Sequence, residues 1–206
     1  MPIQDLVHDF QRSVSEIQTY IQNAFSVGGN GQYIFNKSFR DFVIESVVVK
    51  IYVAWESFLE RCFENYVMKQ PSVSGVVYMR YANPTDNDHA RRMALGNQKF
   101  IEWGNPTIVL TLCGLYLDSG EPFQSIIAGI NNDLINLRNV RNAAAHLSST
   151  TQRSLEAAAT KILGVPSPGI TVSDLVLSKH PGSQTDETIL DVYIKTLDAA
   201  VCAIAR

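Results

Sequence analysis

Apolar residues recur at steps of three and four along much of the chain, which is the pattern of helices that bury one face. A first helix is predicted over residues 2–23 by the stripe Leu6, Phe10, Val14, Ile17 and Ile21. Comparable stripes predict helices over residues 106–117, from 121 through the stretch that ends at 146, over 150–163, and from 185 to the end. Thr185 is expected to cap the last helix. The fold class is therefore expected to be all-α.

A long second helix is predicted over residues 38–69, where apolar residues occupy nearly every face between Phe42 and Phe58. Its β-branched residues leave a strand open as an alternative for residues 47–53, but length favours a helix that is buried on more than one side. Ser38 with Asp41 three residues later resembles a capping box with a shorter acid. We find no internal repeat and no heptad array.

Residues 71–106 have no long periodic stretch, and we expect a partly irregular insertion with a short helix near 86–95. Gly28 to Gly31 predict a turn without the lysine of a phosphate-binding loop. Asp86, Asp88 and His89 are interpreted as a helix start, since no second cluster completes a metal site. The insertion also carries basic and aromatic residues, which form either an RNA platform or a solvated surface held by aromatic packing. These residues are Arg91, Arg92, Lys99, Tyr78, Tyr81 and Trp103.

Composition fits a single domain over residues 1–206, with 46% hydrophobic residues and a net charge of −3. This charge excludes a strongly basic nucleic-acid coat but leaves room for a local basic site. The three cysteines are far apart, which suits reduced thiols buried as small apolar groups. The first residues do not resemble a signal peptide, and the longest apolar run is too short for a membrane span. A cytoplasmic protein without membrane contact is expected.

The stretch from Leu134 to His146 carries the most specific chemistry, because it holds Arg141, Asn142 and His146 near the end of a predicted helix. Arginine binds phosphate through a planar fork of donors, and histidine moves protons near neutral pH. On an ideal helix Asn142 and His146 share a face, whereas Arg141 and His146 lie about 140° and roughly 7.5 Å apart. The two therefore flank one groove, meet through a deformed helix end, or combine across two copies of the chain.

An alternative needs no chemistry: these arginines are solvated helix residues and His146 is a C-terminal residue favoured by the helix dipole. A resemblance favours the chemical interpretation. Arg141 and Asn142, followed by His146, resemble the signature of the HEPN superfamily. In that signature an arginine and a polar residue are followed by a histidine after four to six positions. The segment 54–60 also looks like an early helix that carries an acid in some members. Ser148 stands where one toxin group has a regulatory tyrosine, so that control is in doubt.

The resemblance implies an all-α HEPN-like helical bundle that acts as a metal-independent endoribonuclease, in a toxin–antitoxin or phage-defence role, without cofactor or metal. It covers the helical core and leaves out the insertion 71–106 and the segment 164–184. It implies an RNA substrate, a homodimer with a composite site, and an antitoxin or other defence-system protein as a possible partner. Some members only bind nucleotides or partners, so a non-catalytic module is the alternative, followed by an unrelated helical interaction protein.

Each site residue has an expected role in this chemistry. His146 is the general acid or base, Arg141 binds and stabilises the phosphate, and Asn142 orients His146 or the phosphate by hydrogen bonding. Arg138 is a weaker candidate for substrate binding. Glu56, a weaker candidate, is expected to fix Arg141 by a hydrogen bond, to raise the pKa of His146, or to belong to a solvated stripe with Glu60 and Glu64.

Overall fold

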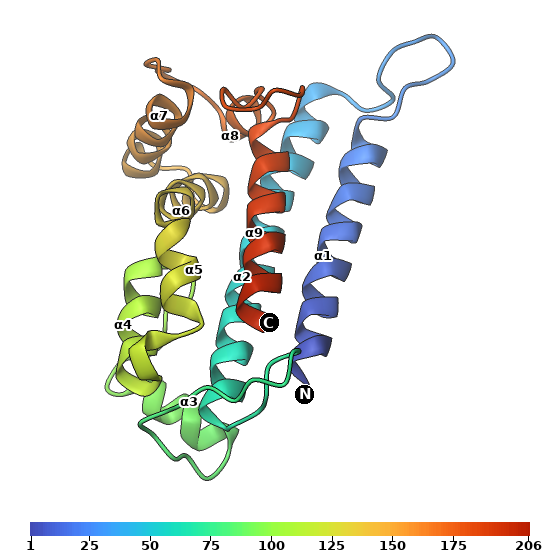
Figure 1. Ribbon diagram of the computed structural model, residues 1–206. Coiled ribbons are helices and arrows are strands. Elements are labelled where there is room, and N and C mark those ends of the chain that lie inside the picture. The colour runs from blue at the N-terminus through green and yellow to red at the C-terminus, as the bar shows by residue number, and fades with distance from the viewer. The chain divides into compact units, whose positions relative to one another are not determined.

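The computed structural model describes all 206 residues and is built from helices without any strand (Figure 1). The all-α fold class is therefore confirmed. None of the helices combines the length and the apolar character needed to cross a bilayer. The helices are α1 (Ile3–Ala24), α2 (Lys37–Val67), α3 (Asn87–Leu95), α4 (Pro106–Tyr116), α5 (Phe123–Gly129), α6 (Asn131–Ala145), α7 (Ser149–Leu163), α8 (Val172–Val176) and α9 (Ile189–Ala205), with a 3-10 turn at Asp118–Gly120.

The chain divides into two compact units, and residues of α1, α2, α6 and α9 belong to both. Unit 1 contains Met1–Gln11, Ala54–Ile135 and Thr196–Arg206, and unit 2 contains Arg12–Val53 and Asn136–Lys195. The second half of α2 and the insertion therefore belong to unit 1. The first half of α2 and the motif segment of α6 belong to unit 2.

The core of unit 1 is built on the aromatic face of the second half of α2. Phe58 stacks edge-on against Phe10 and lies near Trp55, while Phe63 packs against Trp103 and Tyr116. The Tyr66 hydroxyl donates to the carbonyl of Ile204 at 2.7 Å, which ties α2 to the end of α9. α4 and α5 pack side by side in this unit (Figure 1).

The insertion is irregular except for α3, as the sequence predicts. Asp86 caps α3 by accepting the N–H of His89 at 2.7 Å, which confirms its interpretation as a helix start. Arg91 pairs with Glu64 at 3.0 Å, and Trp103 is buried against Phe63. Arg91 and Trp103 thus help to hold the insertion, and an RNA platform on this segment stays a prediction.

Glu64 corrects the interpretation of the acidic stripe on α2 as solvated. Glu64 is only 6% exposed, and its carboxylate accepts the Nε–H of Arg91. Burial raises the pKa of Glu64, although Arg91 and Arg61 act in the opposite direction. The carboxylate thus anchors α3 to α2.

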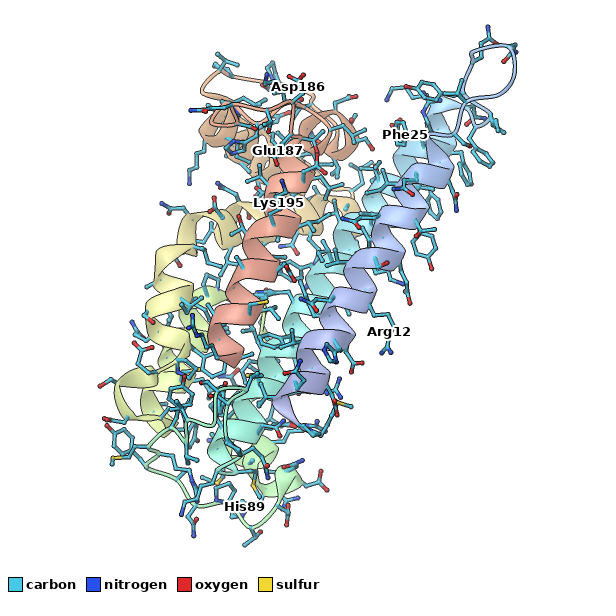
Figure 2. All side chains as sticks on the ribbon, turned by 45° about the vertical axis from the view of Figure 1, so that its right-hand side comes forward. Arg12, Phe25, His89, Asp186, Glu187 and Lys195 are labelled. Carbon is cyan, nitrogen blue, oxygen red and sulfur yellow. The ribbon has the colours of Figure 1, made fainter.

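Unit 2 brings the end of α1 against the start of α2, joined by the turn that the glycines predict. Val27 and Tyr33 form an isolated bridge around Gly28 to Gly31, and Arg40 lies over the rings of Phe25 and Tyr33 at 5.4 and 4.1 Å. Figure 2 shows Phe25 where α1 ends and this turn begins. Lys50 pairs with Glu16 at 2.8 Å and so links α2 to α1 further along.

Two helix caps differ from the sequence prediction by two or three residues. Asn36, not Ser38, caps α2 by accepting the N–H of Phe39 at 2.9 Å, and Asp41 pairs with Lys37. Thr188, not Thr185, caps α9 in a reciprocal arrangement with Asp191. In both places several cap-forming residues lie close together in sequence, and the backbone decides which one is used.

Three further predictions need correction. The helix expected from 121 onward is broken at Ile130, which separates α5 from α6. The segment 164–184 contains the short helix α8, which no periodicity indicated. Cys202 is exposed, whereas Cys62 and Cys113 are buried as expected and burial raises their pKa.

Candidate functional site

The motif residues lie at the C-terminal end of α6, within unit 2. Leu137 and Val140 are buried and fix the orientation of this helix, so that Arg138, Arg141 and Asn142 are half-buried at its side. Ala143 is buried, while Ala144 and Ala145 are progressively more exposed. The helix therefore emerges from the core as it approaches His146.

Arg141 is held by an aromatic ring and by its neighbour in sequence. Its guanidinium carbon lies 4.4 Å from the ring centroid of Tyr52, a fully buried residue of α2. Its Nη1 donates to the Oδ1 of Asn142 at 3.0 Å. A guanidinium can stack on a ring through its face and donate through its edge, which is compatible with phosphate binding.

The two ends of the Asn142 side-chain amide have different surroundings. The oxygen is occupied by Arg141, and the nitrogen makes no hydrogen bond within the chain. The amide nitrogen therefore remains as a donor beside the arginine. The expected role of orienting His146 is not seen at the side-chain level, since the amide oxygen faces Arg141 instead.

His146 is the first residue after α6. The helix ends at Ala145, yet the backbone N–H of His146 still donates to the carbonyl of Asn142 at 3.0 Å. Its own carbonyl accepts the Thr151 hydroxyl at 2.6 Å, and Ser148 caps α7 two residues later. The backbone is thus fixed on both sides, while the exposed imidazole makes no hydrogen bond within the chain.

This helix end bears on the geometries left open by the sequence, because α6 ends at Ala145. His146 takes no further part in a continuing helix, so the ideal 140° separation from Arg141 does not apply to its side chain. Whether Arg141 and His146 combine through this helix end, along one groove or across two copies stays a prediction. Next to His146, Leu147 is 88% exposed and leaves the histidine without a covering side chain.

The two weaker candidates differ in their surroundings. Arg138 lies one turn before Asn142 on α6 and is half-buried. Glu56 belongs to unit 1, where its Oε1 accepts the backbone N–H of Gly104 at 3.0 Å. This bond gives Glu56 a structural task in holding the end of the insertion. Its role toward Arg141 or His146 stays a prediction.

Tyr52 is the site residue that the sequence analysis does not identify. It lies in the apolar run of α2, where a tyrosine reads as one more core residue. Its only signal is an aromatic ring with a polar tip in an otherwise aliphatic stretch, and nothing in that stretch points to an arginine on α6. Only the fold brings the two together.

No protein-family model, no curated protein and no solved structure matches this chain. The resemblance to HEPN proteins therefore rests on the motif residues and their position on a helix.

Proposed function

We propose that this chain is a metal-independent endoribonuclease of the HEPN type. The observation that carries the proposal is the end of α6, where Arg141 stacks on Tyr52 and bonds to Asn142 shortly before an exposed, hydrogen-bond-free imidazole. A phosphate-binding fork and a proton carrier are the groups that RNA transesterification needs. RNA supplies the remaining group, its own 2′-hydroxyl.

The chemistry divides among the three residues. The imidazole of His146 takes the proton of the 2′-hydroxyl as that oxygen bonds to the adjacent phosphorus. The bond from phosphorus to the 5′-oxygen then breaks, and the leaving oxygen takes up a proton from the imidazolium or from water. Arg141 and the amide nitrogen of Asn142 donate to the phosphate oxygens while their negative charge grows. The products are a 2′,3′-cyclic phosphate and a 5′-hydroxyl.

The wider context of the proposal follows from the resemblance. It places the enzyme in the cytoplasm, in a toxin–antitoxin or phage-defence role, with an antitoxin or other defence-system protein as partner. It also includes a homodimer in which both chains contribute to a composite site. Arg138 is proposed to bind substrate, and Glu56 to act on the site, both as weaker assignments.

The test is cleavage of a mixed RNA pool in the presence of EDTA by the wild type, Arg141→Ala and His146→Ala. We expect the wild type to cut RNA but not DNA of the same sequence, and both variants to lose most of this activity. Arg153→Ala is the matched control, because Arg153 is an exposed arginine on α7 that bonds to the backbone of Ser149. Activity that EDTA abolishes, or that survives in both motif variants, would refute the mechanism.

The ring of Tyr52 provides a prediction about how Arg141 is positioned. Tyr52→Phe and Tyr52→Leu both remove the hydroxyl, but only leucine removes the ring beneath the guanidinium. We expect the leucine variant to cleave RNA about tenfold more slowly than the phenylalanine variant, because a desolvated cation–π contact contributes roughly 1–2 kcal/mol. Initial cleavage rates, compared at temperatures where both variants are folded, measure the difference. Equal rates would mean that the ring does not position Arg141.

A non-catalytic helical module remains the second candidate, and one observation favours it. An apolar surface along the first half of α2 is exposed in unit 2, which is typical of a protein that binds a partner.

A further inference from the structure

The first half of α2 exposes a line of residues that the sequence alone does not distinguish. The exposed or half-buried positions of this line follow one another at steps of three, four, three and four: Phe39, Phe42, Ser46, Val49 and Val53. The opposite face of the same helix is buried in the chain's own core. Its residues are Ile44, Val47, Val48, Ile51 and Tyr52. We call the exposed line the α2 seam.

Two hollows border the α2 seam; the first is lined almost entirely by apolar atoms and the second by a mixture that is mostly apolar. One, of about 270 Å³, lies between α1 and α2 and includes Tyr20, Phe35 and Phe39. The other, of about 380 Å³, lies between Val49 and Val53 of α2 and Ala144 of α6. Phe42 and Ser46 line both, and Phe42 is 64% exposed. The surface is therefore a ridge with a groove on each side.

This spacing is the one through which two helices pack along each other. Steps of three and four that alternate over two heptads are the a and d positions of a helix pair. Such residues are normally buried by the other helix, and contiguous exposed apolar surface marks an interaction site. The apolar ridge continues beyond Phe39 to Phe35, whose ring stacks on it at 4.5 Å. The occupant that fits is another helix.

The charges beside the α2 seam indicate which helix docks there. Glu45 and Lys50 occupy the flanking g and e positions when Phe39 is assigned to position a. In a parallel pair of helices, a residue at g lies opposite the residue five positions later at e in the other helix. Glu45 of one copy then faces Lys50 of the other, and symmetry forms this ion pair twice.

The surroundings of these two residues agree with such a pairing. Glu45 forms no salt bridge within its own chain, and its half-buried carboxyl has a raised pKa because of burial and of nearby Asp41. Lys50 is already held at the groove edge by Glu16 at 2.8 Å and by the ring of Tyr20. A lysine from a second copy would supply the cation that Glu45 lacks.

We infer that a second copy of this chain docks on the α2 seam, with the two α2 helices parallel and Glu45 of each opposite Lys50 of the other. Ser46, at the centre, is small enough to let the two helices approach closely. The inference rests on the surface of unit 2 and stands whether or not the chain cleaves RNA. Because Ala144 borders the same groove, three residues from Arg141, the docked copy would lie beside the motif and could complete the composite site of the proposed ribonuclease.

The first experiment measures the molar mass of the full chain over a range of concentrations by sedimentation and light scattering. The wild type is expected to dimerise, and Phe42→Glu and Val53→Glu to weaken dimerisation about a hundredfold or more, since each would bury an unpaired charge. Phe100→Glu and Met79→Glu are the matched controls, because both residues are more than 70% exposed and lie in unit 1. All four positions are on the surface, so the fold should be retained.

The second experiment tests the parallel register through the charges. Glu45→Lys and Lys50→Glu, each alone, are expected to weaken dimerisation by about tenfold, since each places two like charges opposite each other twice. An equimolar mixture of the two variants should regain dimerisation as a heterodimer, because every lysine then faces a glutamate. In an antiparallel pair, Glu45 would face Glu45 and Lys50 would face Lys50 already in the wild type, so neither single variant would weaken dimerisation, and this result would contradict the parallel register.

The outcomes separate the inference from the ribonuclease proposal. A wild type that stays monomeric, or a dimer that the seam charges leave unchanged, would overturn the inference and leave the α2 seam to a helix of another protein. Loss of RNA cleavage in His146→Ala with an unchanged dimer would support the catalytic proposal alone. A heterodimer that cleaves no RNA would support the docking surface alone.

Discussion

His146→Ala is expected to lower the rate of RNA cleavage by about 10²–10⁴-fold, the range that a positioned general acid or base contributes. The imidazole is exposed and makes no hydrogen bond within the chain, so its removal should leave the fold intact. The backbone bonds of residue 146 to Asn142 and Thr151 do not depend on the side chain. The loss would therefore report on chemistry and not on stability.

His8→Ala is the matched control for this prediction. His8 is an exposed histidine in the middle of α1, bonded to Gln4 one turn earlier, and it lies outside the motif. Its variant should cleave RNA at the wild-type rate. Comparable losses in both variants, or a His146→Ala variant with the wild-type rate in single-turnover kinetics, would contradict the assignment of His146 as the proton carrier.

The second large effect is on stability and concerns the aromatic contact that holds the insertion. Phe63 is 1% exposed and packs against Trp103 and Tyr116, which belong to the insertion and to α4. Phe63→Ala should reduce the free energy of unfolding by about 3–5 kcal/mol, through lost apolar contact and the cavity that remains. Urea denaturation, followed by circular dichroism, gives this difference directly.

Phe100→Ala is the matched control for this prediction, since Phe100 belongs to the same insertion but is 73% exposed. Its substitution should change the free energy of unfolding by less than about 0.5 kcal/mol. A small effect of Phe63→Ala, similar to that of Phe100→Ala, would mean that the insertion is not held to α2 by this cluster.

Most helices could be predicted because their apolar residues repeat at helical steps and turn residues separate them. α1, α4 and α7 begin and end within about one or two residues of the expected positions. The break at Ile130 could not be predicted, because the apolar steps of α5 continue in phase into α6. The caps of α2 and α9 were placed wrongly because residues with similar capping preference stand side by side.

The candidate site was predictable only as far as it is local in sequence. Arg141, Asn142 and His146 are found by their spacing, and the bond between Arg141 and Asn142 joins neighbours. Tyr52 and the bond from Gly104 to Glu56 depend on segments that are far apart in the chain, which periodicity does not report. The α2 seam escaped detection for a related reason. Apolar residues cover nearly every face of α2, and only the fold decides which of them stay exposed.

The chemistry of the cut ends tests the proposed function most directly. An end-labelled RNA is incubated with the wild type in EDTA, and the new ends are identified by mass spectrometry. A parallel substrate carries a single 2′-deoxy nucleotide on the 5′ side of the cut position. We predict a 2′,3′-cyclic phosphate and a 5′-hydroxyl on the first substrate and no cut at that position on the second. A 3′-hydroxyl with a 5′-phosphate, or cleavage beside the 2′-deoxy nucleotide, would contradict transesterification by Arg141 and His146.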